Sequence, residues 1–163
     1  MKYRFILASS MLMISFFSFS NTDIVQGPFK ITLSDKVYFQ TEADDDYPLA
    51  LYILSDNKSK RIDTYETEGG KPAVQTVFFM TIDGKKNVIV LISWEQLHRA
   101  ENINGNFFRV YGYVYEKNNL IVNKKINSDP NLSGQDGDFS GEQLFFKYKN
   151  AKAIKEYILK KYQ

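Results

Sequence analysis

The sequence predicts an α+β domain in which an antiparallel β-sheet of about seven strands packs against one C-terminal amphipathic helix. Short apolar runs recur along the chain between Gly, Pro, Asn and Asp residues, which is typical of strands joined by turns. Asp83-Gly84 separates two of the longest runs, and this dipeptide favours a tight hairpin. Only the last segment of the chain has apolar residues at helical spacing. Strands followed by a single helix are typical of the α+β class.

Residues 1–20 are predicted to be a signal peptide that is not part of the fold. Lys2 and Arg4 precede an apolar stretch, and small serines lead up to Ser20, as they do before a cleavage point. An uncleaved anchor is the alternative, but the stretch is shorter than the roughly 20 apolar residues that a span needs. We therefore expect cleavage near Ser20, a single β-rich domain over residues 21–163, and a periplasmic or secreted location.

Composition excludes several classes of function. The chain contains no cysteine, so thiol catalysis, disulfides and a lipid-modified cysteine are excluded. Once Lys2 and Arg4 are removed, basic and acidic residues are equal in number. This balance disfavours binding to nucleic acid and to anionic membranes. The abundance of lysine and asparagine, together with the lack of cysteine, favours a bacterial periplasmic protein.

Four strands are predicted in the first half of the domain, over residues 29–33, 37–39, 49–54 and 61–65. The first alternates apolar and polar residues, as a half-buried strand does. The third is apolar on both faces, which favours an inner strand or one covered on both sides. A polar turn at residues 56–59 separates the third strand from the fourth.

The centre of the sheet is predicted to be a hairpin of residues 77–82 and 88–92, with Lys85-Lys86-Asn87 extending its loop. Residues 94–100 are ambiguous and are compatible with a helical turn, because Glu95 and Arg99 are four residues apart. Three further strands are expected, at residues 107–115, 120–122 and 144–146. A long polar loop is expected between Asn127 and Gly141.

The C-terminal helix is predicted over residues 150–162. Ala151, Ile154, Ile158 and Tyr162 form one apolar stripe, and Asn150 is a suitable N-cap. The stripe is expected to pack on the sheet. Lysines on the opposite face leave membrane association as an alternative, but no stable membrane insertion is expected after signal cleavage.

Catalytic machinery is not recognisable in the sequence. His98 is the only histidine, and Ser93 precedes it by five residues without the Gly-x-Ser-x-Gly pattern of a nucleophile elbow. The interpretation we favour for His98 is a polar residue at the edge of a loop. A pair of carboxylates acting as general acid and base remains an alternative, because glycoside hydrolysis needs only two acids at a set separation.

A weak metal site is predicted in the polar loop, although no cofactor is expected. Asp129 and Asn131 place oxygen ligands at alternate positions, as at the start of a calcium-binding loop, but the twelfth position is Ser140 where such a loop needs glutamate. Asp136 and Asp138 would complete an irregular oxygen site. The alternative is a solvated loop held by Asx turns.

Two segments are candidates for binding a protein partner. Asp44, Asp45, Asp46 and Tyr47 belong to the densest run of acidic residues; the alternatives are a docking surface for a basic partner and a solvated loop. Tyr111, Tyr113 and Tyr115 alternate along one predicted strand and therefore share one sheet face. That face is predicted to be core or, if exposed, a contact surface.

These observations favour an exported, non-enzymatic binding protein. The specific hypothesis is an immunity or inhibitor protein that blocks a secreted toxin or a cell-wall hydrolase by protein–protein contact. Two alternatives remain: a module that binds glycans or another small ligand through the tyrosine face or a sheet–helix cleft, and an acid-dependent hydrolase.

Overall fold

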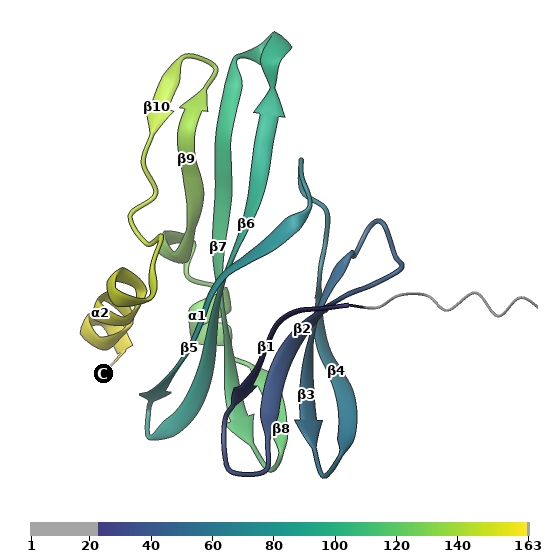
Figure 1. Ribbon diagram of the computed structural model, residues 1–163. Coiled ribbons are helices and arrows are strands. Elements are labelled where there is room, and N and C mark those ends of the chain that lie inside the picture. The colour runs from purple at the N-terminus through teal and green to yellow at the C-terminus, as the bar shows by residue number, and fades with distance from the viewer. Residues whose placement is uncertain (1–22, 163) are drawn as a thin grey trace, which may run out of the picture.

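The computed structural model describes residues 23–162, so the predicted signal peptide lies outside the described residues. The chain forms two antiparallel sheets, of four and six strands, and a C-terminal helix. The larger sheet is the middle layer, between the smaller sheet and the helix (Figure 1). The α+β architecture is confirmed, whereas the single sheet of about seven strands is wrong.

The smaller sheet is a meander of four strands in the order β1-β2-β3-β4. Its strands are β1 (Ile24–Lys30), β2 (Lys36–Thr41), β3 (Leu49–Ser55) and β4 (Lys58–Tyr65). The strand predicted over residues 29–33 is correct only for Phe29 and Lys30, since β1 ends at Lys30 and Leu33 is fully exposed. The carbonyl of Asp35 accepts hydrogen bonds from the amides of Ile31 and Thr32, so turn hydrogen bonding prevails there over the alternating pattern.

The larger sheet has the order β10-β9-β7-β6-β5, with β8 also paired to β7. Its strands are β5 (Pro72–Ile82), β6 (Lys85–His98), β7 (Ile103–Glu116), β8 (Asn119–Val122), β9 (Ser133–Phe139) and β10 (Glu142–Leu144). The predicted β5–β6 hairpin is confirmed, and both Asp83 and Gly84 have the positive φ that its two-residue turn requires. Strands β8 and β9 pair with different halves of the same edge of β7.

Two segments of the larger sheet differ from the prediction. The possible helical turn at residues 94–100 is instead the end of β6, which continues to His98 before a 3₁₀ turn at Arg99–Glu101. The polar loop expected between Asn127 and Gly141 contains β9, because β7 supplies hydrogen-bonding partners that a Gly- and Asp-rich segment does not reveal by itself. Lys85 and Lys86 likewise belong to β6 and do not extend the hairpin loop.

The strand β6 explains why the fold has three layers. Val88, Val90, Ile92 and Trp94 face the smaller sheet, whereas Ile89 and Leu91 face the helical layer. All six side chains are almost completely buried. A strand with two apolar faces must be covered on both sides. The helical layer covers one face of β6, and the smaller sheet covers the other.

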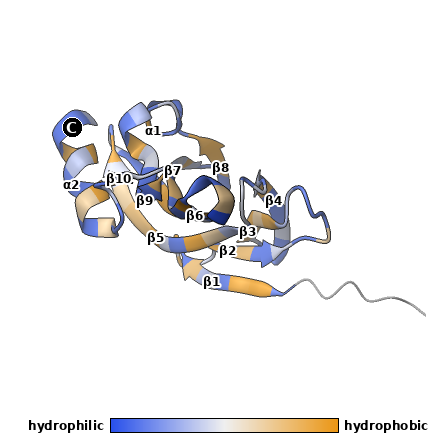
Figure 2. Ribbon diagram, turned by 90° about the horizontal axis from the view of Figure 1, so that it is seen from above, coloured by the Kyte–Doolittle hydropathy of each residue, from blue (hydrophilic) through white to orange (hydrophobic). Residues whose placement is uncertain are grey.

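The helical layer consists of α1 (Lys124–Asn127) and α2 (Ala151–Tyr162). Asn150 is the N-cap of α2, since its side-chain oxygen accepts a hydrogen bond from the amide of Ala153 at 3.0 Å. Ile154 and Ile158 are fully buried against the larger sheet, as the apolar stripe predicts. Seen from above, α2 and the smaller sheet lie on opposite sides of β5–β7 (Figure 2). Within residues 23–162, no helix has the length and apolar character needed to cross a bilayer.

Candidate functional site

The acidic loop (residues 42–47) connects β2 to β3 and has a fixed backbone. The amide of Glu42 donates to the carbonyl of Pro48 at 2.9 Å, which closes the base of the loop. Thr67, which follows β4, donates from its amide to the carbonyl of Asp46 at 2.8 Å. Its hydroxyl donates to the carbonyl of Asp45 at 2.9 Å. The segment after β4 therefore holds the tip of the acidic loop.

The four acidic side chains of this loop divide into two kinds. Asp44 accepts hydrogen bonds from the amides of Asp46 and Tyr47 at 2.9 and 3.2 Å, which forms a local turn. Glu42 accepts a hydrogen bond from the hydroxyl of Tyr52 at 2.6 Å. Burial and this contact with Glu42 raise the pKa of Tyr52 to about 12. Glu42 and Asp44 therefore help to hold the loop in place.

Asp45, Asp46 and Tyr47 are the exposed polar side chains of the acidic loop that do not form a local turn, as the exposed Asp44 does. All three are exposed, Tyr47 by 42%. Among the described residues, no hydrogen bond or ion pair engages either carboxylate. A pocket of about 170 Å³ lies beside Tyr47 and is also lined by Glu42, Asp44, Arg61 and Thr64. The predicted candidate surface thus consists of two uncompensated charges and one aromatic ring on a fixed backbone.

The predicted tyrosine face packs toward the smaller sheet, with Tyr113 buried and Tyr111 and Tyr115 partly buried. Tyr113 is fully buried, and its hydroxyl lies 2.8 Å from that of Tyr65 and 2.7 Å from a carboxylate oxygen of Asp63. Tyr111 packs edge-on against Tyr65. Burial raises the pKa of Tyr113 well above its usual value. These residues join the sheets, so they are not part of the contact surface proposed below.

Tyr115, the third residue of that face, bonds to the buried carboxylate of Asp35. Its hydroxyl donates to Asp35, whose side chain also accepts hydrogen bonds from Ser34 and Ser55. The bond from Tyr115, with those from the two serines, lowers the pKa of Asp35 although burial opposes the change. Tyr115 therefore ties β7 to the turn between β1 and β2.

The three aspartates predicted to bind metal accept hydrogen bonds from protein donors, and Asn131, the fourth residue, is one of those donors. The side chain of Asp129 is fully buried and accepts a hydrogen bond from Lys161 at 2.9 Å, and Asn131 donates to the same carboxylate. Asp136 forms an ion pair with Lys149 at 2.8 Å. Asp138 accepts a hydrogen bond from the amide of Gly141. Nowhere in residues 23–162 do three or more His, Cys, Asp or Glu side chains gather around one point.

Ser93 and His98 do not form a catalytic pair. Both lie on β6, but an odd separation of five residues directs their side chains to opposite faces of the strand. Ser93 is buried and accepts a hydrogen bond from Gln75 at 2.8 Å, whereas His98 is exposed at the end of the strand. Ser93 and His98 were considered together only because they are close in the sequence, and the geometry of β6 places their side chains apart.

A second surface feature, which the sequence analysis missed, is a groove of about 540 Å³ along α2. Its walls include Lys147, Tyr148, Glu156, Tyr157 and Lys161. The only sequence signal for it is that Tyr157 and Lys161 are four residues apart and therefore share a helix face. The segment that completes the wall comes from the chain before α2, and its position depends on tertiary packing.

No protein-family model, curated protein or solved structure matches the chain.

Proposed function

We propose that the chain is an exported, non-enzymatic binding protein that blocks a secreted toxin or a cell-wall hydrolase by protein–protein contact, as an immunity protein does. The observation that carries the proposal is the acidic loop, in which a hydrogen-bonded backbone presents Asp45, Asp46 and Tyr47 to solvent. The proposed partner presents a basic cleft to this loop.

The physical chemistry of such a contact fits these three residues. Two uncompensated carboxylates accelerate encounter with a basic surface and orient it. A fixed backbone reduces the conformational entropy lost on binding, which favours affinity. Tyr47 adds an aromatic ring of the kind that contributes strongly to interface energies. A basic cleft is the feature that an enzyme acting on an anionic polymer needs, and an acidic loop can occupy it without any chemistry of its own.

The acid-dependent hydrolase has less support. A general acid needs a carboxyl group whose pKa is raised by its surroundings. The two most deeply buried carboxylates, Asp35 and Asp129, instead have lowered pKa values because hydrogen-bond donors stabilise their charge. The ligand-binding alternative has a specific feature in its favour, the groove along α2.

The experiment is a comparative pull-down with the mature domain, residues 21–163, as bait for periplasmic and secreted proteins. The test variant is D45N/D46N, whose stability should match that of the wild type because neither carboxylate makes a contact within the described chain. The control is E101Q/E142Q, the same charge change at two other exposed positions.

We expect the wild type and E101Q/E142Q to retain one stoichiometric partner and D45N/D46N to lose most of it. The purified partner should be a toxin or hydrolase whose activity falls as the mature domain is added. Equal retention by D45N/D46N would remove the acidic loop from the interface. A partner whose activity is unchanged at saturation would exclude inhibition.

A further inference from the structure

The groove along α2 has the size of a small-ligand site. Its volume of about 540 Å³ lies within the roughly 300–1,000 Å³ of typical ligand pockets. One wall is the flank of α2 that carries Glu156, Tyr157, Lys160 and Lys161, and the other is formed by Lys147 and Tyr148. None of these residues belongs to the acidic loop, so the groove is a separate feature of the molecule.

Two of the groove side chains are positioned from below by a buried charge. The carboxylate of Asp129 accepts hydrogen bonds from the Tyr157 hydroxyl at 2.8 Å and from Lys161 Nζ at 2.9 Å. Lys161 Nζ also donates to the Tyr157 hydroxyl at 2.9 Å. Since the Asp129 side chain has no exposed surface, it holds both groups in place without itself reaching the groove. The lysine and the tyrosine are therefore preorganised.

The net positive charge of the groove favours a ligand that carries an anionic group. Three lysines line it against one acid, Glu156. Lys161 is balanced by Asp129, but Lys160 makes no interaction within the described chain, and Lys147 only lies 5.8 Å from the Tyr148 ring centroid. Two ammonium groups at one groove thus lack a carboxylate partner. A phosphate or carboxylate group of a ligand would satisfy them.

The other walls of the groove suit a ring that carries hydroxyl groups. The rings of Tyr148 and Tyr157 are 4.7 Å apart between centroids and tilted by 46°, so they form a continuous aromatic surface. The C–H face of a sugar ring packs on such a surface, and Glu156 on the same wall can accept hydrogen bonds from sugar hydroxyls. We propose that this groove binds an anionic saccharide, with its acidic group at Lys147 and Lys160 and its ring against Tyr148 and Tyr157.

The test is NMR titration of the mature domain with glucose 6-phosphate, glucose and inorganic phosphate as separate probes. We expect glucose 6-phosphate to shift the ring signals of Tyr148 and Tyr157 saturably and to bind about tenfold more tightly than either fragment, because both parts of the site are used. Absence of a saturable shift would overturn the proposal. Equal affinity for inorganic phosphate would overturn its saccharide part.

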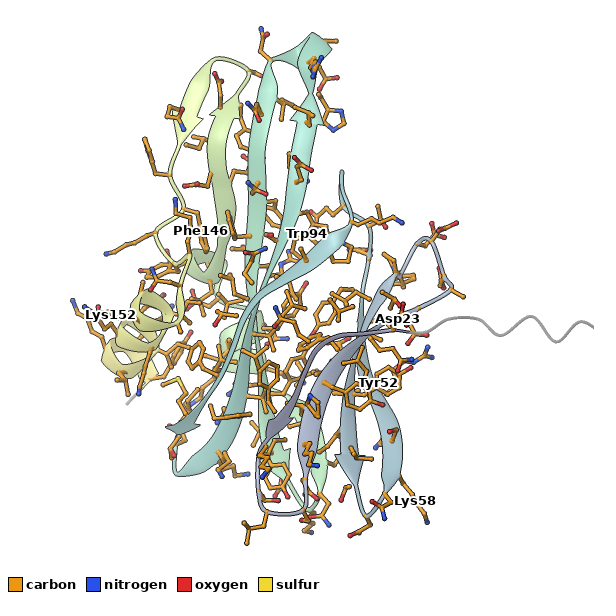
Figure 3. All side chains as sticks on the ribbon, in the orientation of Figure 1. Asp23, Tyr52, Lys58, Trp94, Phe146 and Lys152 are labelled. Carbon is orange, nitrogen blue, oxygen red and sulfur yellow. The ribbon has the colours of Figure 1, made fainter. Side chains whose placement is uncertain are left out.

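Two lysine variants separate the groove from the general charge of α2. K160Q removes a groove lysine, whereas K155Q removes an exposed lysine from the opposite flank of the same helix. Lys152 projects away from the sheets (Figure 3) but stays unchanged, because it lies 4.0 Å from Glu156 in the groove wall. We expect affinity for glucose 6-phosphate to fall about tenfold in the first variant and little in the second, since screening weakens distant charges. Equal losses in both variants would show non-specific attraction to a basic helix and would overturn the site.

Discussion

Asp129 joins the segment before β9 to α2. Its buried carboxylate accepts hydrogen bonds from Lys161, Tyr157 and Tyr162, and from the amide of Asn131. Burial alone would raise the pKa of Asp129, but these donors together outweigh burial and lower it to about 2. The residue that sequence reasoning assigned to a metal is therefore stabilised by protein donors, which a linear spacing of oxygen ligands cannot distinguish from metal ligands.

Asp129 should make the free energy of unfolding depend on pH over a defined acidic range. Because its pKa is lower in the folded than in the unfolded state, its contribution is complete above about pH 4 and is lost as the pH falls toward 2. We expect Asp129→Asn to destabilise the fold by about 2–3 kcal/mol near neutral pH. The gap between variant and wild type should narrow below pH 4, as measured by urea denaturation.

Asp138→Asn is the matched control, since Asp138 is exposed and accepts only one backbone hydrogen bond. It should stay within about 1 kcal/mol of the wild type. A constant gap between Asp129→Asn and the wild type from pH 6 to 2 would contradict the role assigned to the buried charge.

At the scale of elements, local signals identified the β5–β6 hairpin and α2 but not β9. The turn dipeptide Asp83-Gly84 and the spacing of Ile154 and Ile158 are properties of short segments, so they can be read without knowing the fold. Strand β9 contains Gly134 and Gly137 and gains its extended form from pairing with β7. The same distinction applies to the candidate sites. The acidic loop is visible in the sequence, whereas the groove requires α2 to be docked.

Gly112 in β7 is where α1 docks onto the larger sheet. A Cβ placed on this residue would lie 2.8–3.0 Å from three side-chain atoms of Ile126. The amide of Gly112 donates to the Asn127 side chain at 2.7 Å. A helix of four residues has little stability of its own, so its position depends on this close approach.

Gly112→Ala should therefore destabilise the protein by about 1–3 kcal/mol through overpacking. The loss should be smaller in an Ile126→Ala background, because alanine lacks the two γ carbons that would lie within 3.0 Å of the new methyl group. A double-mutant cycle of chemical denaturation measures this coupling. Strictly additive effects would show that the two side chains do not compete for space.

At the scale of the whole molecule, a nearly neutral net charge is made up of one acidic region and one basic region. The acidic loop carries four acids within residues 42–46, and α2 with the segment before it carries six lysines against one glutamate. These regions lie on opposite sides of the molecule, beyond the smaller sheet and beyond the larger one (Figure 1). The overall charge balance disfavoured nucleic acid and anionic membranes, but it averages over surfaces that a partner contacts separately.

The two-sheet arrangement could not be derived from the sequence for a related reason. The apolar faces of β3 and β6 indicate that both strands are covered, and the sequence does not say by what. Which strands share a sheet depends on pairings between residues far apart in the chain, such as those that place β9 beside β7. Tyr113 is buried because the smaller sheet covers this face of β7. For the same reason the three tyrosines do not form a contact surface for a partner.

The most direct test of the central claim is the association rate between the mature domain and its captured partner, measured at low and high ionic strength. If the acidic loop directs binding, the rate for D45N/D46N should be lower than that of the wild type at low salt and should vary less with salt. E101Q/E142Q should behave like the wild type. Identical rates and salt dependence for D45N/D46N and the wild type would contradict the account.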